Sequence, residues 1–227
     1  MVKVRNSIKW QDYAFVFILI SDLISLAIGN ENIHALIKPF VVPSIAFYFL
    51  SKEVIKYKAG KYLVMVLLFS WLGDILLIFD SSLYFLLGLF SFLMAHFFYI
   101  LIFSSYTMPF KIRVTHLVII LFFLVIATFI LQAVWNRTGN LQVPVLIYTI
   151  IISVMGVTAT FNTIENGYYY SLFGALLFIV SDALIALNTF HSISVEGLNF
   201  PLLIMLTYIG AQLILVSSVI KQMNKTI

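Results

Sequence analysis

Two aspartates lie within segments that otherwise consist almost entirely of apolar residues. Asp74 lies in FSWLGDILLIFD, residues 69–80, and Asp182 lies in VSDALIAL, residues 180–187. A charged residue in the middle of a bilayer costs at least about 2.5–3.5 kcal/mol, so it normally faces the bundle interior or a wet cavity. A carboxyl group there either takes part in function, for example by handling protons, or is protonated and holds helices together. We expect the first role for this pair.

Further polar residues recur at helical spacing in the same kind of segment. His96 and Tyr99 are three residues apart and share a helix face, as do residues 208 and 212, four apart. Each is interpreted either as a residue that positions a substrate or as a hydrogen-bonded interior residue. The candidates for substrate binding or positioning are Lys38, His96, Tyr99, Asn188, Tyr208 and Gln212.

Lys38 precedes Pro39, which is suited to the first turn of a helix. The lysine either extends to the membrane surface or presents a cation to a phosphate group. We expect neither a metal nor a cofactor, because cysteine is absent and only His96 among the four histidines lies near the depth of the aspartates.

The composition places these residues in a membrane protein. Hydrophobic residues make up 63% of the 227 residues, charged residues 10%, and the mean hydropathy is +1.10. Apolar runs recur along the whole chain, each long enough to cross a bilayer. They predict an all-α integral membrane protein with a single domain over residues 1–227, a compact bundle of eight transmembrane helices at roughly 13–29, 36–51, 61–79, 83–105, 114–134, 143–163, 169–190 and 200–220.

The distribution of Lys and Arg predicts the orientation of the bundle. The N-terminus, the second link, the fourth link and the C-terminus hold 11 of the 13 basic residues, and the opposite links hold only Arg137. Because cytoplasmic segments are enriched in basic residues, both termini are expected to be cytoplasmic. The net charge of +4 is thus interpreted as a topology signal, and no nucleic-acid partner is expected.

The segments around the two aspartates also resemble each other. LGDILLIF and VSDALIAL share a small residue, an aspartate and aliphatic residues at the same spacing. Because Asp74 lies 13 residues after Lys61, and Asp182 lies 13 residues after Tyr169, both aspartates are expected about 20 Å from the cytoplasmic edge. Residues 1–110 and 111–227 would then be two parallel four-helix repeats, although a match this short also arises by coincidence.

Five short motifs follow one another along most of the chain. They are KPFVVP (38–43), FSWLGDILLIF (69–79), GLFSFLMAHFFYI (88–100), GALLFIVSDALIALNTF (174–190) and YIGAQLIL (208–215). Taken together, these motifs resemble the YhhN family of membrane lysoplasmalogenases. The resemblance implies hydrolysis of the vinyl ether bond of a lysoplasmalogen, which gives a fatty aldehyde and a glycerophospho-base. It also implies that Asp74 and Asp182 are the catalytic pair.

The chemistry of that reaction suits two carboxyl groups. Protonation of a vinyl ether at carbon gives an oxocarbenium-like cation, which water then captures, so one carboxyl acts as the acid and the other stabilises the cation. The expected partners are a lysophospholipid substrate and membrane lipid, and the expected location is the cell membrane, as in a bacterial inner membrane. Two rivals remain open: a proton-coupled transporter or flippase of a small amphiphile, and a scaffold whose aspartates are purely structural.

We further expect Asp74, Asp182 and His96 to line one cavity, with Lys38 and Asn188 toward its outer end. The sequence leaves open which aspartate is the acid.

Overall fold

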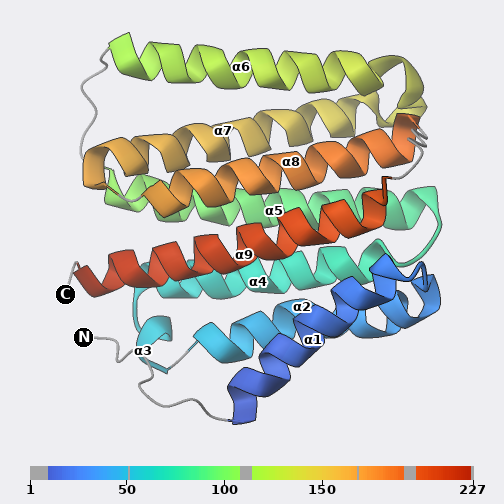
Figure 1. Cartoon of the computed structure of the whole chain (residues 1–227). Helices are drawn as coiled ribbons and strands as arrows, with labels where there is room; N and C mark the ends of the chain where they lie inside the picture. The colour runs from blue at the N-terminus through green and yellow to red at the C-terminus, as the bar shows by residue number, and fades with distance from the viewer. Residues whose placement is uncertain (1–9, 51, 108–113, 168, 192–197, 226–227) are drawn as a thin grey trace.

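A computed structural model describes residues 10–50, 52–107, 114–167, 169–191 and 198–225 of the chain. Within these ranges the regular elements are all helical (Figure 1). They are α1 (Trp10–Ala27), α2 (Glu31–Phe49), α3 (Lys52–Ile55), α4 (Lys58–Leu76), α5 (Ser82–Tyr106), α6 (Val114–Val134), the 3₁₀ turns η1 (Trp135–Arg137) and η2 (Gly139–Leu141), α7 (Gln142–Asn166), α8 (Tyr169–His191) and α9 (Phe200–Lys225).

Seven of the described helices are long and apolar enough to cross a membrane: α2 and α4 to α9. The apolar part of α1, Tyr13–Ala27, is shorter. The eight apolar segments expected from the sequence thus correspond to α1, α2 and α4 to α9, with ends that differ by a few residues. The all-helical architecture is confirmed for the described residues, with seven helices long and apolar enough to cross a membrane. The cytoplasmic position of the termini and the internal repeat stay predictions.

The start of α2 differs from the expectation that Pro39 begins a helix. Asn30 caps the helix instead, because its side chain accepts a hydrogen bond from the Ile33 N–H at 3.1 Å. Pro39 and Pro43 therefore lie inside α2. Pro43 has no N–H to donate to the Pro39 carbonyl four residues earlier, and the indole Nε1–H of Trp71 on α4 donates to that carbonyl at 2.8 Å. A neighbouring helix thus satisfies the backbone group that the second proline leaves open.

The helices form layers that run across the bundle in the order seen in Figure 1. α6 lies along one edge next to α7, α1 and α2 form the opposite edge, and α4, α5, α8 and α9 lie between them. The buried fraction of the spans is highest in α9 and lowest in α2 and α6. The polar residues discussed below come mainly from the central helices, where their side chains are shielded from lipid.

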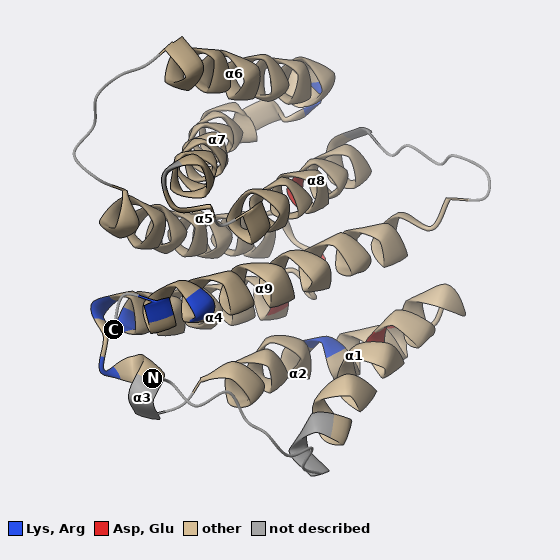
Figure 2. Ribbon diagram, turned by 60° about the vertical axis from the view of Figure 1, so that its left-hand side comes forward, with Lys and Arg blue, Asp and Glu red and all other residues tan. Residues whose placement is uncertain are grey.

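Basic residues gather at one end of the bundle. Figure 2 shows Lys and Arg concentrated where α4 begins and α9 ends, the end at which the C-terminus lies. Arg137 follows α6 at the opposite end. We call these the basic end and the far end. The asymmetry agrees with the charge bias read from the sequence, and the face of the membrane that each end occupies stays a prediction.

Candidate functional site

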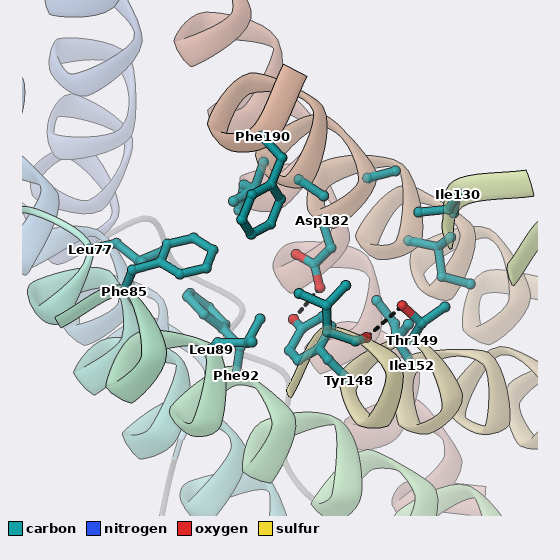
Figure 3. A pocket seen from close by; sticks show the side chains of 15 residues that line it. Leu77, Phe85, Leu89, Phe92, Ile130, Tyr148, Thr149, Ile152, Asp182 and Phe190 are labelled. Carbon is teal, nitrogen blue, oxygen red and sulfur yellow. Dashed lines mark hydrogen bonds between the residues drawn. The ribbon is translucent and has the colours of Figure 1, made fainter. Parts of the chain in front are cut away.

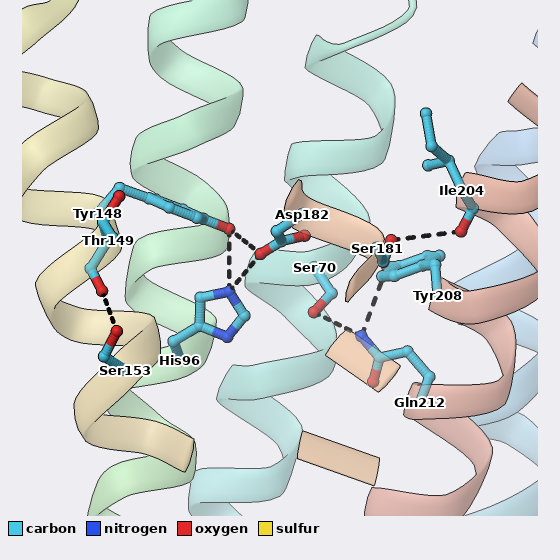
Figure 4. Close-up of polar contacts among 10 residues, drawn as sticks. All are labelled: Ser70, His96, Tyr148, Thr149, Ser153, Ser181, Asp182, Ile204, Tyr208 and Gln212. Atoms are coloured by element: carbon cyan, nitrogen blue, oxygen red, sulfur yellow. Dashed lines mark hydrogen bonds and ion pairs between the residues drawn. The ribbon is translucent and has the colours of Figure 1, made fainter. Parts of the chain in front are cut away.

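Asp182 lies in a hydrogen-bonded group of three side chains drawn from three helices, α5, α7 and α8 (Figure 4). The Tyr148 hydroxyl, on α7, donates to Asp182 Oδ2, on α8. His96, on α5, places its Nε2 3.0 Å from the same oxygen and 2.9 Å from the Tyr148 hydroxyl. All three side chains are buried or nearly so, and that of Asp182 is 8% exposed. This group of three is the Asp182 cluster.

The donors in the Asp182 cluster can be assigned by counting protons. Tyr148 has a single hydroxyl proton, which it donates to Asp182. Its contact with His96 therefore requires His96 Nε2 to be the protonated nitrogen. Nδ1 of His96 is buried and has no hydrogen-bond partner among the described residues, which suits a bare acceptor better than a second N–H. Asp182 Oδ2 thus accepts two hydrogen bonds, whereas no residue that the structure describes donates to Oδ1.

Asp182 lines an apolar cavity. The cavity holds about 650 Å³ of space between atoms, part of it open to the outside, and Asp182, Tyr148 and Thr149 are the polar members of its lining. In Figure 3 aromatic and aliphatic side chains from several helices surround the space into which the Asp182 carboxyl group points. They include Leu77, Phe85, Leu89, Phe92, Ile152 and Phe190. A single hydrocarbon chain fits this lining chemically, and its polar end would meet Asp182.

Asp74 belongs to a second network. Its Oδ2 accepts a hydrogen bond from the Tyr208 hydroxyl of α9 at 2.9 Å. Gln212, one turn further along α9, donates to Ser70 of α4 at 2.8 Å and accepts from Tyr99 of α5 at 3.2 Å. All five side chains are buried, and Asp74 is 2% exposed. We call them the Asp74 network; it joins α4, α5 and α9 (Figure 4 shows Ser70, Tyr208 and Gln212).

Aromatic rings separate the two aspartates. Phe178 of α8 packs edge to face against His96 on one side, at 4.7 Å between ring centroids, and against Tyr208 on the other, at 5.6 Å. Phe92 lines the apolar cavity and also packs against Tyr208. A Cβ atom on Gly73 would lie 2.6 Å from the Phe92 ring, so the glycine next to Asp74 allows this close packing.

The expectation that Asp74, Asp182 and His96 line one cavity is therefore corrected for two of the three residues. His96 is fully buried and is not part of the lining of the apolar cavity. Asp182 lines the apolar cavity, whereas Asp74 lies behind its aromatic wall.

A polar pocket adjoins the apolar cavity at the far end. It holds about 1170 Å³ of space between atoms, part of it open to the outside, and its lining includes Lys38 and Asn188. Leu77, Phe85 and Ile185 line both spaces, so the two are neighbours. Lys38 and Asn188 thus line this neighbouring pocket and not the apolar cavity itself. That the pocket faces the outside of the membrane stays a prediction.

Comparison with known proteins then places the chain. The model of the YhhN family matches residues 33–219, which is most of the chain. The chain belongs to the YhhN family. Searches of the curated proteins and of the solved structures each found no match. The YhhN match contains every residue of the Asp182 cluster and the Asp74 network, together with Lys38 and Asn188.

Tyr148 is the member of the Asp182 cluster that sequence reasoning missed. It lies in VLIYTI (145–150), seven residues after the 3₁₀ turn that ends at Leu141, and carries no motif of its own. The sequence shows only a tyrosine within the sixth apolar segment. That this tyrosine lies on the inward face becomes clear only when α7 is seen to pack against α5. Ser70 was missed for the same reason, although it precedes Asp74 by one helical turn.

Asp22 and His34 form a further buried pair. His34 Nδ1 lies 2.9 Å from Asp22 Oδ1, while Asp22 Oδ2 has no hydrogen-bond partner within the described parts of the chain. Asp22 is on α1, which lies outside the residues matched by the YhhN model.

Across the described residues, no group of three His, Asp or Glu side chains is arranged to hold a metal ion.

An inner polar cluster of amide and hydroxyl side chains lies nearer the basic end. The Asn162 and Gln222 side chains exchange two hydrogen bonds, at 2.6 and 3.1 Å. Asn162 also donates to Ser171, which contacts Ser218. These amides and hydroxyls join α7, α8 and α9 and satisfy one another, so they fit a role in holding the helices together.

Proposed function

We propose that this YhhN protein is a membrane lysoplasmalogenase, which hydrolyses the vinyl ether bond of an alkenyl-glycerophosphocholine or alkenyl-glycerophosphoethanolamine. The observation that carries the proposal is the apolar cavity that Asp182 lines and that adjoins a polar pocket containing Lys38. A lysophospholipid has the same division, with one hydrocarbon chain and one charged headgroup. Membership of the YhhN family supports the proposal independently.

The reaction needs a proton donor at the end of the hydrocarbon cavity. Asp182 gives its proton to the second carbon of the alkenyl chain, and the first carbon, bonded to the ether oxygen, becomes an oxocarbenium-like cation. Water adds to that carbon and loses a proton, which restores the acid. The resulting hemiacetal then breaks its bond to the glycerol oxygen, and its hydroxyl proton passes to that oxygen, so the products are a fatty aldehyde and a glycerophospho-base.

The neighbours of Asp182 orient this proton transfer. Tyr148 and His96 hold Oδ2, which leaves Oδ1 as the oxygen that carries the proton toward the cavity.

Asp74 supplies the second carboxyl group and acts on the cation through its charge from behind the aromatic wall. Tyr99, Tyr208 and Gln212 fix the position of Asp74, while Lys38 and Asn188 meet the headgroup.

The setting of the reaction is part of the proposal. Both termini and the basic end face the cytoplasm of a cell membrane, as in a bacterial inner membrane, so the polar pocket opens on the opposite side. A lysophospholipid with its chain already in the bilayer then reaches the apolar cavity without leaving the membrane.

Turnover in detergent tests the proposal. Purified protein is incubated with lysoplasmalogens, and release of the fatty aldehyde is measured beside lysolipids that carry an ester or a saturated ether in place of the vinyl ether. Aldehyde release from the vinyl ethers alone is expected. No turnover in detergent, together with movement of the lysolipid between compartments in sealed vesicles, would establish a transporter in place of a hydrolase.

A further inference from the structure

Two opposite charges line the polar pocket without neutralising each other. Lys38 of α2 and Asp80, in the turn between α4 and α5, both belong to its lining. Neither makes a salt bridge with the other or with any further residue that the structure describes. Asp80 is exposed and Lys38 is partly buried. The pocket therefore offers a cation and a carboxylate as two separate binding groups.

The other polar residues of the pocket are hydrogen-bonding groups near these charges. Ser81 and Ser82 follow Asp80 directly, and Asn188 and Thr189 come from α8 on the other side. Hydroxyl and amide oxygens accept hydrogen bonds, as the Asp80 carboxylate does. An ammonium group with three N–H donors needs several such acceptors around it.

A quaternary ammonium group needs different surroundings, because it has no N–H and is held best over the faces of several aromatic rings. The polar pocket has two aromatic residues, Phe79 and Phe85. Phe79 packs against Tyr84 at 4.8 Å between ring centroids, and Phe85 packs against Phe190 at 5.6 Å. The lining thus provides acceptors for a primary ammonium but no cage of rings for a quaternary one.

We infer that the polar pocket selects a zwitterionic headgroup, with the phosphate at Lys38 and a primary ammonium at Asp80. This inference rests on the proposed function and narrows it: the preferred substrate is of the phosphoethanolamine type, and Asp80 is the residue that determines specificity. A phosphate headgroup without an amine meets Lys38 equally well but is repelled by the Asp80 carboxylate.

The test compares three vinyl ether lysolipids that share one alkenyl chain and differ in headgroup: phosphoethanolamine, phosphocholine and a bare phosphate. For Asp80→Asn, kcat/KM for the phosphoethanolamine substrate is expected to fall by about two- to fivefold, the range for an exposed charge pair. For the bare phosphate kcat/KM is expected to rise, because a repulsive charge has been removed. Lys38→Met is expected to lower kcat/KM for all three, mainly through KM.

Glu31→Gln is the matched control. Glu31 is also exposed, lies in the first turn of α2 toward the far end, and is not part of the pocket lining. It should leave the ratios among the three substrates unchanged. Asp80→Glu should restore the preference for phosphoethanolamine, and high salt, about 1 M, should weaken it in the wild type, since salt screens exposed charges.

The outcomes separate the two proposals. If none of the three lysolipids is hydrolysed by the wild type, the proposed function fails. If all are hydrolysed and Asp80→Asn changes their kcat/KM values by the same factor, hydrolysis stands and the role of Asp80 is overturned. A wild-type preference for phosphocholine would likewise overturn it.

Discussion

Asp74 and Asp182 each follow a small residue in similar apolar sequences, yet the bundle gives them different surroundings. Asp182 has two donors on one oxygen and a cavity beside it. Asp74 is enclosed by Tyr208 and the aromatic wall and has no place in the cavity lining. Under the proposed function, this difference gives Asp182 a role in contact with the substrate and Asp74 a role through its charge alone. Substitutions at each aspartate test this division.

The largest effect is expected for Asp182→Asn. The amide can still accept the hydrogen bonds from Tyr148 and His96 through its oxygen, so the protein should fold. It has no acidic proton to transfer, and kcat for aldehyde release should fall by roughly 10²–10⁴-fold. A variant with normal thermal stability that kept more than a tenth of the wild-type kcat would exclude Asp182 as the acid.

A smaller loss is expected for Asp74→Asn. This change keeps the shape of the Asp74 network but removes the second carboxyl group, which acts from a distance, so kcat should fall by up to about 10²-fold. The double variant should be little worse than Asp182→Asn, because residues that serve one step are not additive. If Asp74→Asn proved more damaging than Asp182→Asn, the roles assigned to the two aspartates would have to be exchanged.

Tyr148→Phe tests how much the orientation of the Asp182 carboxyl group contributes to kcat. The phenyl ring preserves the packing against His96 and removes the hydroxyl that donates to Asp182 Oδ2 and accepts from His96. His96 Nε2–H still reaches Oδ2, so a loss of about tenfold in kcat with little change in KM is expected, equivalent to the one hydrogen bond that Oδ2 loses. An unchanged kcat would show that His96 alone suffices to orient the acid.

Two glutamines on α9, Gln222 and Gln212, allow the same substitution in two different polar networks. The smallest catalytic effect is expected for Gln222. Gln222→Leu leaves buried Asn162 without two of its hydrogen bonds, which should cost roughly 1–3 kcal/mol of stability and leave kcat unchanged. Gln212→Leu makes the same chemical change in the Asp74 network and should lower both the stability and kcat. Thermal unfolding and aldehyde release, measured on both variants, would show whether the inner polar cluster is purely structural; a loss of kcat in Gln222→Leu would argue against it.

Much of the fold follows from hydrophobicity, because a span needs a run of apolar residues and the links here are short. The sequence also indicated which polar residues face inward, since Asp74, Asp182, His96, Tyr99, Tyr208 and Gln212 are all buried or partly buried. It could not assign their partners. Those depend on which helices pack together, and helical periodicity does not determine the packing. Tyr148 and Phe178 illustrate this limit, because each matters through contacts with a different helix.

The most direct measurement follows the fate of the alkenyl carbon in heavy water. Wild-type protein should convert a lysoplasmalogen to a fatty aldehyde that carries one deuterium on the carbon next to the carbonyl group. Asp182→Asn should release almost none, and the saturated ether analogue should remain intact with either protein. Failure of the wild type to release aldehyde, or equal release of the labelled aldehyde by Asp182→Asn, would contradict the claim that Asp182 protonates the vinyl ether.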